Sequence, residues 1–204
     1  VKYILPPEKN DGGNVIFCTS TVKGEGKTYV SINLSLALSS LNKKVLLIGA
    51  DLRNPQIHNY IDKDKNGLGL SSYLHETDSV WQSLLIKGFM NHDTHDVLLS
   101  GVIPPNPSHL LANDRFEKLI NEAKELYDYI IVDTTPTILV TDTMLISSLA
   151  DATLYIVRAN YTEKELLSFS KDLHKTGKLK NMSYVINGVG ASKSKGYGYN
   201  YGYG

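Results

Sequence analysis

Short apolar runs alternate along this chain with segments in which apolar residues recur at helical spacing. The strongest runs predict strands at 14–19, 44–48 and 129–133, and weaker ones predict strands at 97–99, 152–157 and 183–186. Helical spacing predicts helices at 27–41, 115–126, 141–149 and 162–176. This alternation indicates an α/β fold, with a mostly parallel central sheet flanked by helices and ligands at the carboxyl ends of its strands.

Some boundaries follow from residues that start or interrupt regular structure. The segment at 56–96 has a weaker pattern, and we expect irregular structure with short helices there. Three prolines at 104–107 rule out regular structure immediately after the preceding strand. Asn113 or Asp114 can cap the helix that follows, and Thr162 with the acidic residues after it favours a helix start at that position.

Composition limits the classes of protein to which the chain can belong. Its 204 residues, 42% of them hydrophobic, suffice for one sizeable core, which we assign to a domain at 1–190. The 21 basic and 21 acidic residues are well mixed, so the sequence shows no basic patch of the kind that binds nucleic acid. Neither a membrane-spanning apolar segment nor a signal peptide is evident, and we expect a cytoplasmic domain. Because the chain begins at Val1, we interpret it as a fragment.

The cysteine and histidine residues offer little chemistry. Cys18 lies inside an apolar run, which predicts a buried strand residue and suits a reducing compartment. His92 and His95, with the aspartates beside them, could bind a metal, but we expect a polar surface loop instead.

Residues 191–204 are predicted to form a flexible tail. Four of the chain's 13 tyrosines alternate there with glycine and asparagine. Glycine at every other position makes an ordered backbone costly, and only the tyrosines could be buried. The repeated chemical group is a phenol hydroxyl, which can accept a phosphate. The candidate acceptors are Tyr197, Tyr199, Tyr201 and Tyr203.

A phosphate-binding loop is predicted at 21–28, where TVKGEGKT lies between a predicted strand and a predicted helix. In such a loop the backbone N–H groups surround phosphate oxygens, and the helix N-terminus adds favourable potential. Lys27 would reach the terminal phosphates and the Thr28 hydroxyl would ligate Mg²⁺.

The pattern GxxxxGKT is not fully met, because Thr21 stands at the first glycine position. Lys23 by itself has the character of a solvated loop residue. The residues assigned to nucleotide binding are Val22, Lys23, Gly24, Glu25, Gly26, Lys27, Thr28 and Tyr29.

Polar residues at the ends of other predicted strands would lie close to this loop. Asp133 ends YIIVD and resembles a Walker B aspartate, which holds Mg²⁺. Asp51 follows KVLLIGA and could meet the same ion, although either aspartate alone could cap the next helix. Two such aspartates beside a phosphate-binding loop favour a metal site shared with Thr28. Arg158 and Asn187 follow the last two strands, where they could line the nucleotide or serve a structural role.

The motifs TVKGEGKT, VLLIGADLRNP, YIIVDTTP and LLSGVIPPNPSHLL, together with the tyrosine-rich end, resemble the cytoplasmic domain of bacterial tyrosine kinases that control capsule and exopolysaccharide synthesis. The resemblance covers nearly the whole chain. It implies a fold similar to the deviant P-loop ATPases of the partitioning and division-site type. It also implies a protein-tyrosine kinase that uses ATP and Mg²⁺ to phosphorylate a C-terminal tyrosine cluster, commonly that of a neighbouring subunit.

The resemblance also assigns roles to single residues. It implies that Lys27 and Thr28 bind phosphate and Mg²⁺ and that Asp133 is the Walker B aspartate. Asp51 and Arg53 would be the last two members of the family's DxDxR motif. The catalytic residues implied in this way are Lys27, Asp51 and Asp133.

Gly49 replaces the first aspartate of the DxDxR motif. In the family that aspartate is a candidate for the base that activates the tyrosine hydroxyl, so we expect weakened or altered base assistance, with Asp51 as the substitute. Phosphoryl transfer depends mainly on positioning and charge neutralisation. Activity need not vanish as a result.

The family also implies a cellular setting. Its kinase domain is associated with the inner membrane, either fused to transmembrane helices or docked on a partner that carries them. The implied partners are neighbouring kinase subunits, a membrane-embedded polysaccharide co-polymerase segment or protein, and a tyrosine phosphatase. The family's oligomerisation helix would precede residues 1–7, so we expect this fragment to be monomeric or weakly associated.

Two other functions compete with the kinase. A partitioning-type ATPase would hydrolyse ATP, but its signature lysine is replaced by Val22. A catalytically weak ATP-binding scaffold of a polysaccharide export system would be consistent with Gly49. Neither alternative requires four phenols in a glycine-rich tail.

Overall fold

A single parallel sheet organises the chain. The computed structural model describes residue 5 and residues 12–61, 67–138 and 142–190. Within these ranges six parallel strands form a sheet with the order β3-β2-β4-β1-β5-β6. The strands are β1 Asn14–Ser20, β2 Val45–Gly49, β3 His95–Leu98, β4 Tyr129–Asp133, β5 Ala152–Arg158 and β6 Met182–Asn187.

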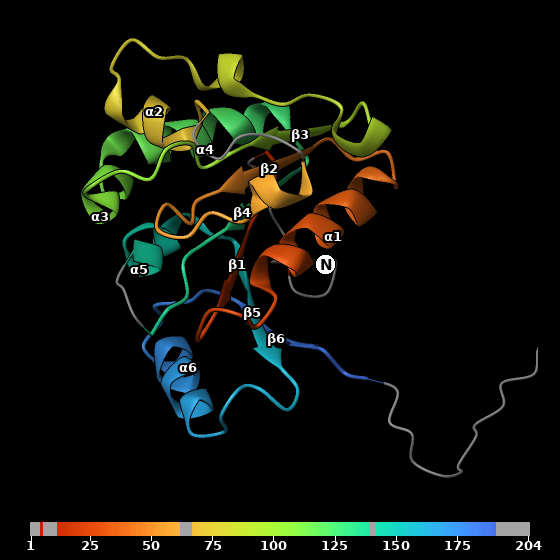
Figure 1. Cartoon of the computed structure of the whole chain (residues 1–204), viewed down its shortest axis with the longest axis vertical. Coiled ribbons are helices and arrows are strands. Elements are labelled where there is room, and N and C mark those ends of the chain that lie inside the picture. The colour runs from red at the N-terminus through yellow and green to blue at the C-terminus, as the bar shows by residue number, and fades with distance from the viewer. Residues whose placement is uncertain (1–4, 6–11, 62–66, 139–141, 191–204) are drawn as a thin grey trace, which may run out of the picture.

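Helices cover both faces of this sheet (Figure 1). The α-helices are α1 Lys27–Ser39, α2 Leu70–His75, α3 Pro107–Leu111, α4 Asp114–Leu126, α5 Asp142–Ile146 and α6 Leu166–Lys175. Short 3₁₀ turns are η1 Ile57–Tyr60, η2 Trp81–Leu84, η3 Phe89–Asn91 and η4 Ser147–Leu149.

The two sides of the sheet bury separate apolar cores. Along β1, Val15 and Phe17 face the α4 side, where Phe116 packs, while Ile16 and Cys18 face the α1 side. Successive strand residues point to opposite faces, and near-continuous apolar runs are what a strand needs when both faces are covered. The predicted α/β fold with a parallel, helix-flanked sheet is confirmed.

Parallel pairing brings the carboxyl ends of the central strands together. Asp133 at the end of β4 lies opposite Cys18 of β1 on one side and opposite Gly49 of β2 on the other. The loops that follow β1, β2 and β4 therefore leave the same edge of the sheet, which is where the site is built.

Most predicted elements are confirmed, with shifts of a few residues at their ends. Asn113 is the N-cap of α4, and its side chain accepts a hydrogen bond from the backbone of Arg115 at 3.0 Å. The predicted proline break holds from residue 99 to residue 106, after which Pro107 starts α3 because its fixed φ suits the first turn of a helix.

The predicted helix start at Thr162 is wrong, since α6 begins at Leu166. Asn160 has a positive φ of 58°, and the Thr162 backbone N–H donates to the Arg158 carbonyl at 2.9 Å. The Thr162 hydroxyl is also engaged, because it accepts from the Arg158 N–H at 2.8 Å. These contacts hold Thr162 in a turn and delay the helix.

In the part of the chain that the structure describes, no helix has the length and apolar character needed to cross a membrane.

The expectation of a polar surface loop is wrong for His95, which is fully buried at the start of β3. Its ring packs edge-on against Phe89, with centroids 5.2 Å apart, and neither ring nitrogen has a hydrogen-bond partner among the described residues. Burial, reinforced by the nearby His92, lowers the pKa of His95 to about 4. No cluster of three or more metal-ligating side chains is found in the described ranges.

His95 should make the free energy of unfolding depend on pH. The unfolded chain takes up a proton near pH 6.5 whereas the folded chain resists it down to about pH 4, so stability should fall as pH is lowered through that window. The loss amounts to roughly 3 kcal/mol. Chemical denaturation of wild type and His95→Leu at pH 7.0 and pH 4.5 measures it. The variant should lose clearly less stability than wild type, and equal losses would contradict this role of His95.

Candidate functional site

The loop between β1 and α1 has the backbone of an anion-binding turn. Within residues 20–28 only Gly24 and Gly26 have positive φ, at 87° and 91°. Gly26 is the N-cap of α1, so the first backbone N–H groups of that helix open into the loop. Thr21, at the first glycine position of the usual pattern, is buried, and its hydroxyl pairs with the Tyr155 hydroxyl at 3.0 Å. Thr21 does not have a positive φ, so this position does not require a glycine.

Glu25 stabilises the loop from inside. Its side chain is fully buried, and one carboxylate oxygen accepts from the Val22 backbone N–H at 2.8 Å while the other accepts from the Thr162 hydroxyl. A buried carboxylate is costly unless it is hydrogen-bonded, and here both oxygens are. Glu25 thus fixes the loop to the segment that follows β5.

Residues at or just beyond the ends of β5 and β6 hold the outside of the same loop. Arg158 donates to the Gly24 carbonyl at 2.9 Å, and the Tyr161 hydroxyl donates to the Lys23 carbonyl at 3.1 Å. The Asn187 amide donates to the Glu25 carbonyl at 2.9 Å. The sequence leaves open whether Arg158 and Asn187 line the nucleotide or serve a structural role, and in this structure both bind the loop backbone.

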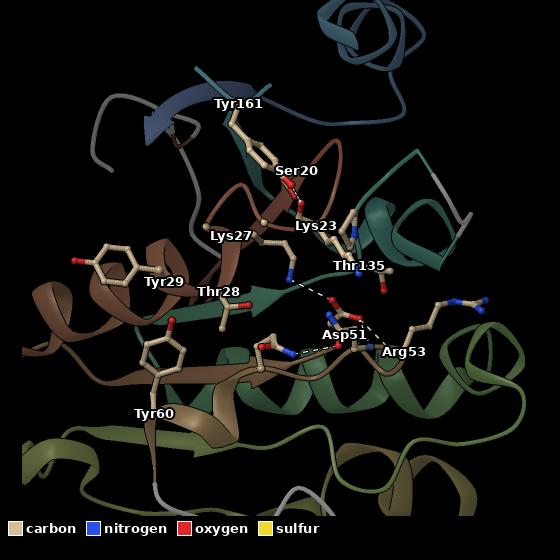
Figure 2. Close-up of a pocket in the computed structure, with 15 residues that line it drawn as sticks. Ser20, Lys23, Lys27, Thr28, Tyr29, Asp51, Arg53, Tyr60, Thr135 and Tyr161 are labelled. Carbon is tan, nitrogen blue, oxygen red and sulfur yellow. Dashed lines mark hydrogen bonds and ion pairs between the residues drawn. The ribbon is translucent and has the colours of Figure 1, made fainter. Parts of the chain in front are cut away.

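A buried ion cluster lies beneath the loop. The Lys27 ammonium donates to one oxygen of Asp133 at 2.7 Å. It also lies 3.5 Å from Asp51 (Figure 2). The Thr28 hydroxyl donates to the other oxygen of Asp133 at 2.7 Å. Ser31, one turn further along α1, adds a weaker contact to Asp133 at 3.3 Å. The three charged side chains come from α1, β4 and the loop after β2.

The protonation states in this cluster follow from burial and pairing. Burial disfavours the charged form of Lys27, but Asp133 and Asp51 outweigh burial and raise the pKa of Lys27 above its usual value. Burial also raises the pKa of Asp51, and the neighbouring Lys27 offsets only part of that rise. Cys18, beneath the cluster, has a pKa raised to about 12 by burial, so it remains a thiol and matches the predicted buried strand residue.

The loop after β2 is held by a second ion pair that the sequence did not indicate. Asp51 accepts from the backbone N–H groups of Arg53 and Asn54, at 3.3 and 3.0 Å. The Arg53 guanidinium forms a bidentate pair with Asp142 of α5, at 2.6 and 3.2 Å, and Ser108 of α3 donates to the same carboxylate at 2.5 Å. Asp142 is buried, whereas Arg53 remains 39% exposed.

Gly49 leaves little room for any larger residue. A Cβ atom at this position would lie 2.6 Å from the Ser100 hydroxyl oxygen and 3.1 Å from the Ser100 backbone nitrogen. The space in which a side chain at position 49 would begin is therefore filled by Ser100.

A pocket of about 540 Å³ opens above the ion cluster (Figure 2). Of the predicted site residues, eight line it, while Val22, Glu25, Arg158 and Asn187 lie around the loop and Asp133 lies beneath Lys27. The four tail tyrosines lie outside the described residues. The lining residues are Ser20, Lys23, Gly24, Gly26, Lys27, Thr28, Tyr29, Asp51, Arg53, Asn54, Gln56, Tyr60, Thr135, Pro136 and Tyr161.

The parallel sheet, the glycine-containing loop at a helix N-terminus and the buried lysine define the chain as a P-loop nucleotide-binding protein. A family model described as an AAA domain matches residues 13–183. Tyrosine-protein kinase YwqD of Bacillus subtilis is 37% identical over 178 residues, which are 87% of this chain and 73% of YwqD. Tyrosine-protein kinase etk of Escherichia coli strain K12 is 35% identical over 86% of this chain.

Solved structures agree with these relatives. The kinase domain of Escherichia coli tyrosine kinase ETK superposes with a TM-score of 0.82 at 30% identity, covering 96% of this chain and 74% of that domain. Partitioning and septum-site ATPases below 25% identity share the fold. The chain belongs to the bacterial tyrosine-protein kinase family. It spans 73% of the length of YwqD but only 24% of the full-length etk protein.

Removing the Glu25 carboxylate should loosen the phosphate-binding loop. Glu25→Ala leaves the Val22 N–H and the Thr162 hydroxyl without their partner. Each lost hydrogen bond costs about 1 kcal/mol, and hydrogen bonds to water recover part of that free energy. We therefore expect nucleotide to bind about tenfold more weakly. Titration with a fluorescent ADP analogue measures the affinity. Glu25→Gln, which retains the shape and one acceptor oxygen, should lose less. Wild-type affinity in Glu25→Ala would contradict the role.

The Arg53–Asp142 pair should contribute to stability. Asp142→Asn keeps the shape but removes the charge that Arg53 and Ser108 contact, and we expect a loss of about 1–3 kcal/mol in the free energy of unfolding. Urea denaturation measures this loss. Ser108→Ala removes one hydrogen bond to the same carboxylate and should cost less than Asp142→Asn. Equal stability of Asp142→Asn and wild type would rule out a structural contribution from the pair.

Proposed function

We propose that this chain is an ATP-dependent protein-tyrosine kinase that phosphorylates tyrosines of its own C-terminal cluster in a system for capsule or exopolysaccharide synthesis and export. The observation that carries the proposal is the cluster of Lys27, Asp51 and Asp133 at the base of the phosphate-binding loop. Family membership supports the reaction class, and the tyrosine-rich tail supplies the acceptors.

ATP with Mg²⁺ is the cofactor that the donor set fits. Thr28, Asp51 and Asp133 offer one hydroxyl and two carboxylates, which are the hard oxygen ligands that Mg²⁺ prefers. Lys27 supplies a single positive charge against two carboxylates, so the cluster can accept a further cation. We infer that these three side chains hold Mg²⁺, which when bound neutralises charge on the transferring phosphate.

The chain's own residues then have distinct tasks. Lys27 leaves Asp133 to contact the terminal phosphates, and the loop N–H groups hold the phosphates in place. The bond between the γ-phosphorus and the ADP oxygen breaks while a bond to the tyrosine oxygen forms, and the phenol proton passes to Asp51. Little early deprotonation is needed in a loose transition state, so the lack of a carboxylate at Gly49 slows the reaction without preventing it.

A weakly catalytic ATP-binding scaffold is the second candidate. The close approach of Ser100 to Gly49 favours it, because Ser100 fills the space where a further carboxylate would begin. A partitioning-type ATPase is disfavoured, because Val22 stands at the position of the signature lysine and its N–H is engaged by Glu25.

The wider setting is also part of the proposal. We infer that tail tyrosines are phosphorylated by neighbouring subunits, that the domain operates at the inner face of the plasma membrane beside a membrane-embedded polysaccharide co-polymerase segment or partner, and that a tyrosine phosphatase reverses the modification. We divide the chain into a kinase domain at 1–190 and an acceptor tail at 191–204.

Lys27→Met should abolish tail phosphorylation. The substitution removes the charge that contacts the terminal phosphates, and loss of one such electrostatic group typically costs about 10²–10³ in rate. Mass spectrometry of the tail peptide after incubation with Mg²⁺ and ATP measures the product.

Lys43→Met is the matched control, because it removes an exposed lysine just beyond the far end of α1, outside the pocket. It should retain phosphorylation within a few-fold of wild type. Equal tail phosphate in Lys27→Met and wild type would exclude this loop as the source. Nucleotide binding by wild type with neither tail phosphate nor phosphate release would favour the scaffold, and phosphate release alone would favour the ATPase.

A further inference from the structure

A buried tyrosine lies beside the start of the phosphate-binding loop. Tyr155 stands in β5, opposite Thr19 of β1, and is fully buried. Its hydroxyl lies 3.0 Å from the hydroxyl of Thr21, the first residue of the loop. It also lies 2.8 Å from the hydroxyl of Thr137, in the segment after β4. One phenol oxygen therefore joins β5 to the segments that follow β1 and β4.

The direction of these hydrogen bonds follows from the protons available. The single hydroxyl proton of Thr137 is donated to the Ser20 carbonyl at 3.2 Å, so Thr137 accepts from Tyr155. Tyr155 also has one proton to give, so it accepts from Thr21. The path runs from Thr21 through Tyr155 and Thr137, and it closes on Ser20, the chain neighbour of Thr21. Each donor in such a path polarises the next, which strengthens the set.

The state and position of the phenol are both set by burial. Burial raises the pKa of Tyr155 above its usual value, so the hydroxyl keeps its proton. Tyr155 packs with Leu173 and Leu179 in the core under α6, and its ring meets the Tyr184 ring edge-on, with centroids 5.8 Å apart. The phenol oxygen is therefore held by the core on the α6 side and can serve as a fixed point for the loop.

The segment after β4 belongs to the same unit. The Thr137 N–H donates to the Ser20 carbonyl at 2.9 Å, and the Ile138 N–H donates to the Thr21 carbonyl at 3.2 Å. Thr135, two residues before Thr137, lines the pocket (Figure 2). Backbone and hydroxyl groups thus join this wall of the pocket to the first residue of the loop.

This path engages a part of the loop that the other contacts do not. Glu25, Arg158 and Asn187 hold the backbone at 22–25, whereas Tyr155 and Thr137 hold residues 20 and 21, where the chain leaves β1. Backbone N–H groups bind an anion best when they are already oriented, because no reorganisation is then needed. Control of the first residue of the loop therefore bears on the affinity for phosphate.

We propose that Tyr155 is a positioning residue of the nucleotide site. Its hydroxyl, acting through Thr21, fixes the point at which the loop leaves β1 and keeps the loop N–H groups oriented toward phosphate. Tyr155 itself does not line the pocket. The inference rests on the proposed binding of nucleotide at this loop and does not depend on transfer of phosphate to tyrosine.

The test measures the Kd of a fluorescent ADP analogue with Mg²⁺ for variants of the full chain. Tyr155→Phe and Thr21→Val each remove one hydroxyl of the path, and Thr21→Ser retains it. Tyr73→Phe is the matched control, because Tyr73 is also buried and its hydroxyl donates to the Arg115 carbonyl at 3.4 Å. Tyr73 lies in the core on the α4 side and does not line the pocket. Urea denaturation of each variant measures its stability separately.

Tyr155→Phe and Thr21→Val should each raise the Kd by about three- to tenfold, because each breaks the path. The double variant should bind within about twofold of the weaker single variant, since both changes break the same path and their effects are not additive. Thr21→Ser and Tyr73→Phe should bind as the parent does. A purely structural role would lower the stability of both phenylalanine variants without this difference in Kd.

Several results would overturn the inference. Parent-like affinity in Tyr155→Phe, or equal weakening in Tyr155→Phe and Tyr73→Phe, would show that the hydroxyl does not position the loop. Effects of the two single changes that multiply in the double variant would show that they act independently. If Tyr155→Phe does not fold, Thr21→Val and Thr21→Ser decide the question, and equal affinity in those two would contradict the path.

Failure of the proposed kinase function gives a different result. The parent would then bind the ADP analogue but leave its tail unphosphorylated with Mg²⁺ and ATP. The affinities of the variants would still decide the role of Tyr155, since they are measured without turnover. A parent that bound no nucleotide at all would overturn both proposals.

Discussion

The structure depends on one buried arrangement of charge, the Lys27 ammonium between the carboxylates of Asp133 and Asp51. Each charge would be costly to bury alone, and the low exposure of all three makes their mutual pairing necessary. They come from three different segments, and only the strand order β2-β4-β1 brings those segments to one edge. The parallel sheet thus determines where phosphate chemistry can take place.

The same arrangement explains how the site can respond to nucleotide. On our proposal, Mg²⁺ would join the cluster as a further cation, because two carboxylates exceed one ammonium, and anionic phosphates would draw Lys27 away from Asp133. The loop above the cluster does not need to reorganise, because Glu25, Arg158 and Asn187 already hold its backbone. A prearranged loop with a movable lysine suits a site that must bind a nucleotide, take part in its reaction and release the product.

Much of the fold and of the candidate site could be predicted from the sequence, because the residues that indicate each strand and motif lie close together along the chain. Apolar runs predicted the strands, and TVKGEGKT, Asp51 and Asp133 were identified as strand-end residues that meet at one edge. Contacts between distant positions could not be predicted. Asp142 pairs with Arg53 across 89 positions, and Thr162 contacts Glu25 across 137, which also explains why the helix start was misplaced. His95 stands in a polar stretch, and it is buried by the pairing of β3 with β2 and by the packing of Phe89 on its ring.

The central claim is that the buried lysine exchanges a carboxylate for phosphate when nucleotide binds. A crystal structure of this chain with Mg²⁺ and a non-hydrolysable ATP analogue tests it most directly. The account predicts the phosphates within the loop at 21–28, the Lys27 nitrogen on their terminal oxygens, and Mg²⁺ beside Thr28, Asp51 and Asp133. Nucleotide bound elsewhere, or Lys27 still paired with Asp133 beneath a bound triphosphate, would contradict it.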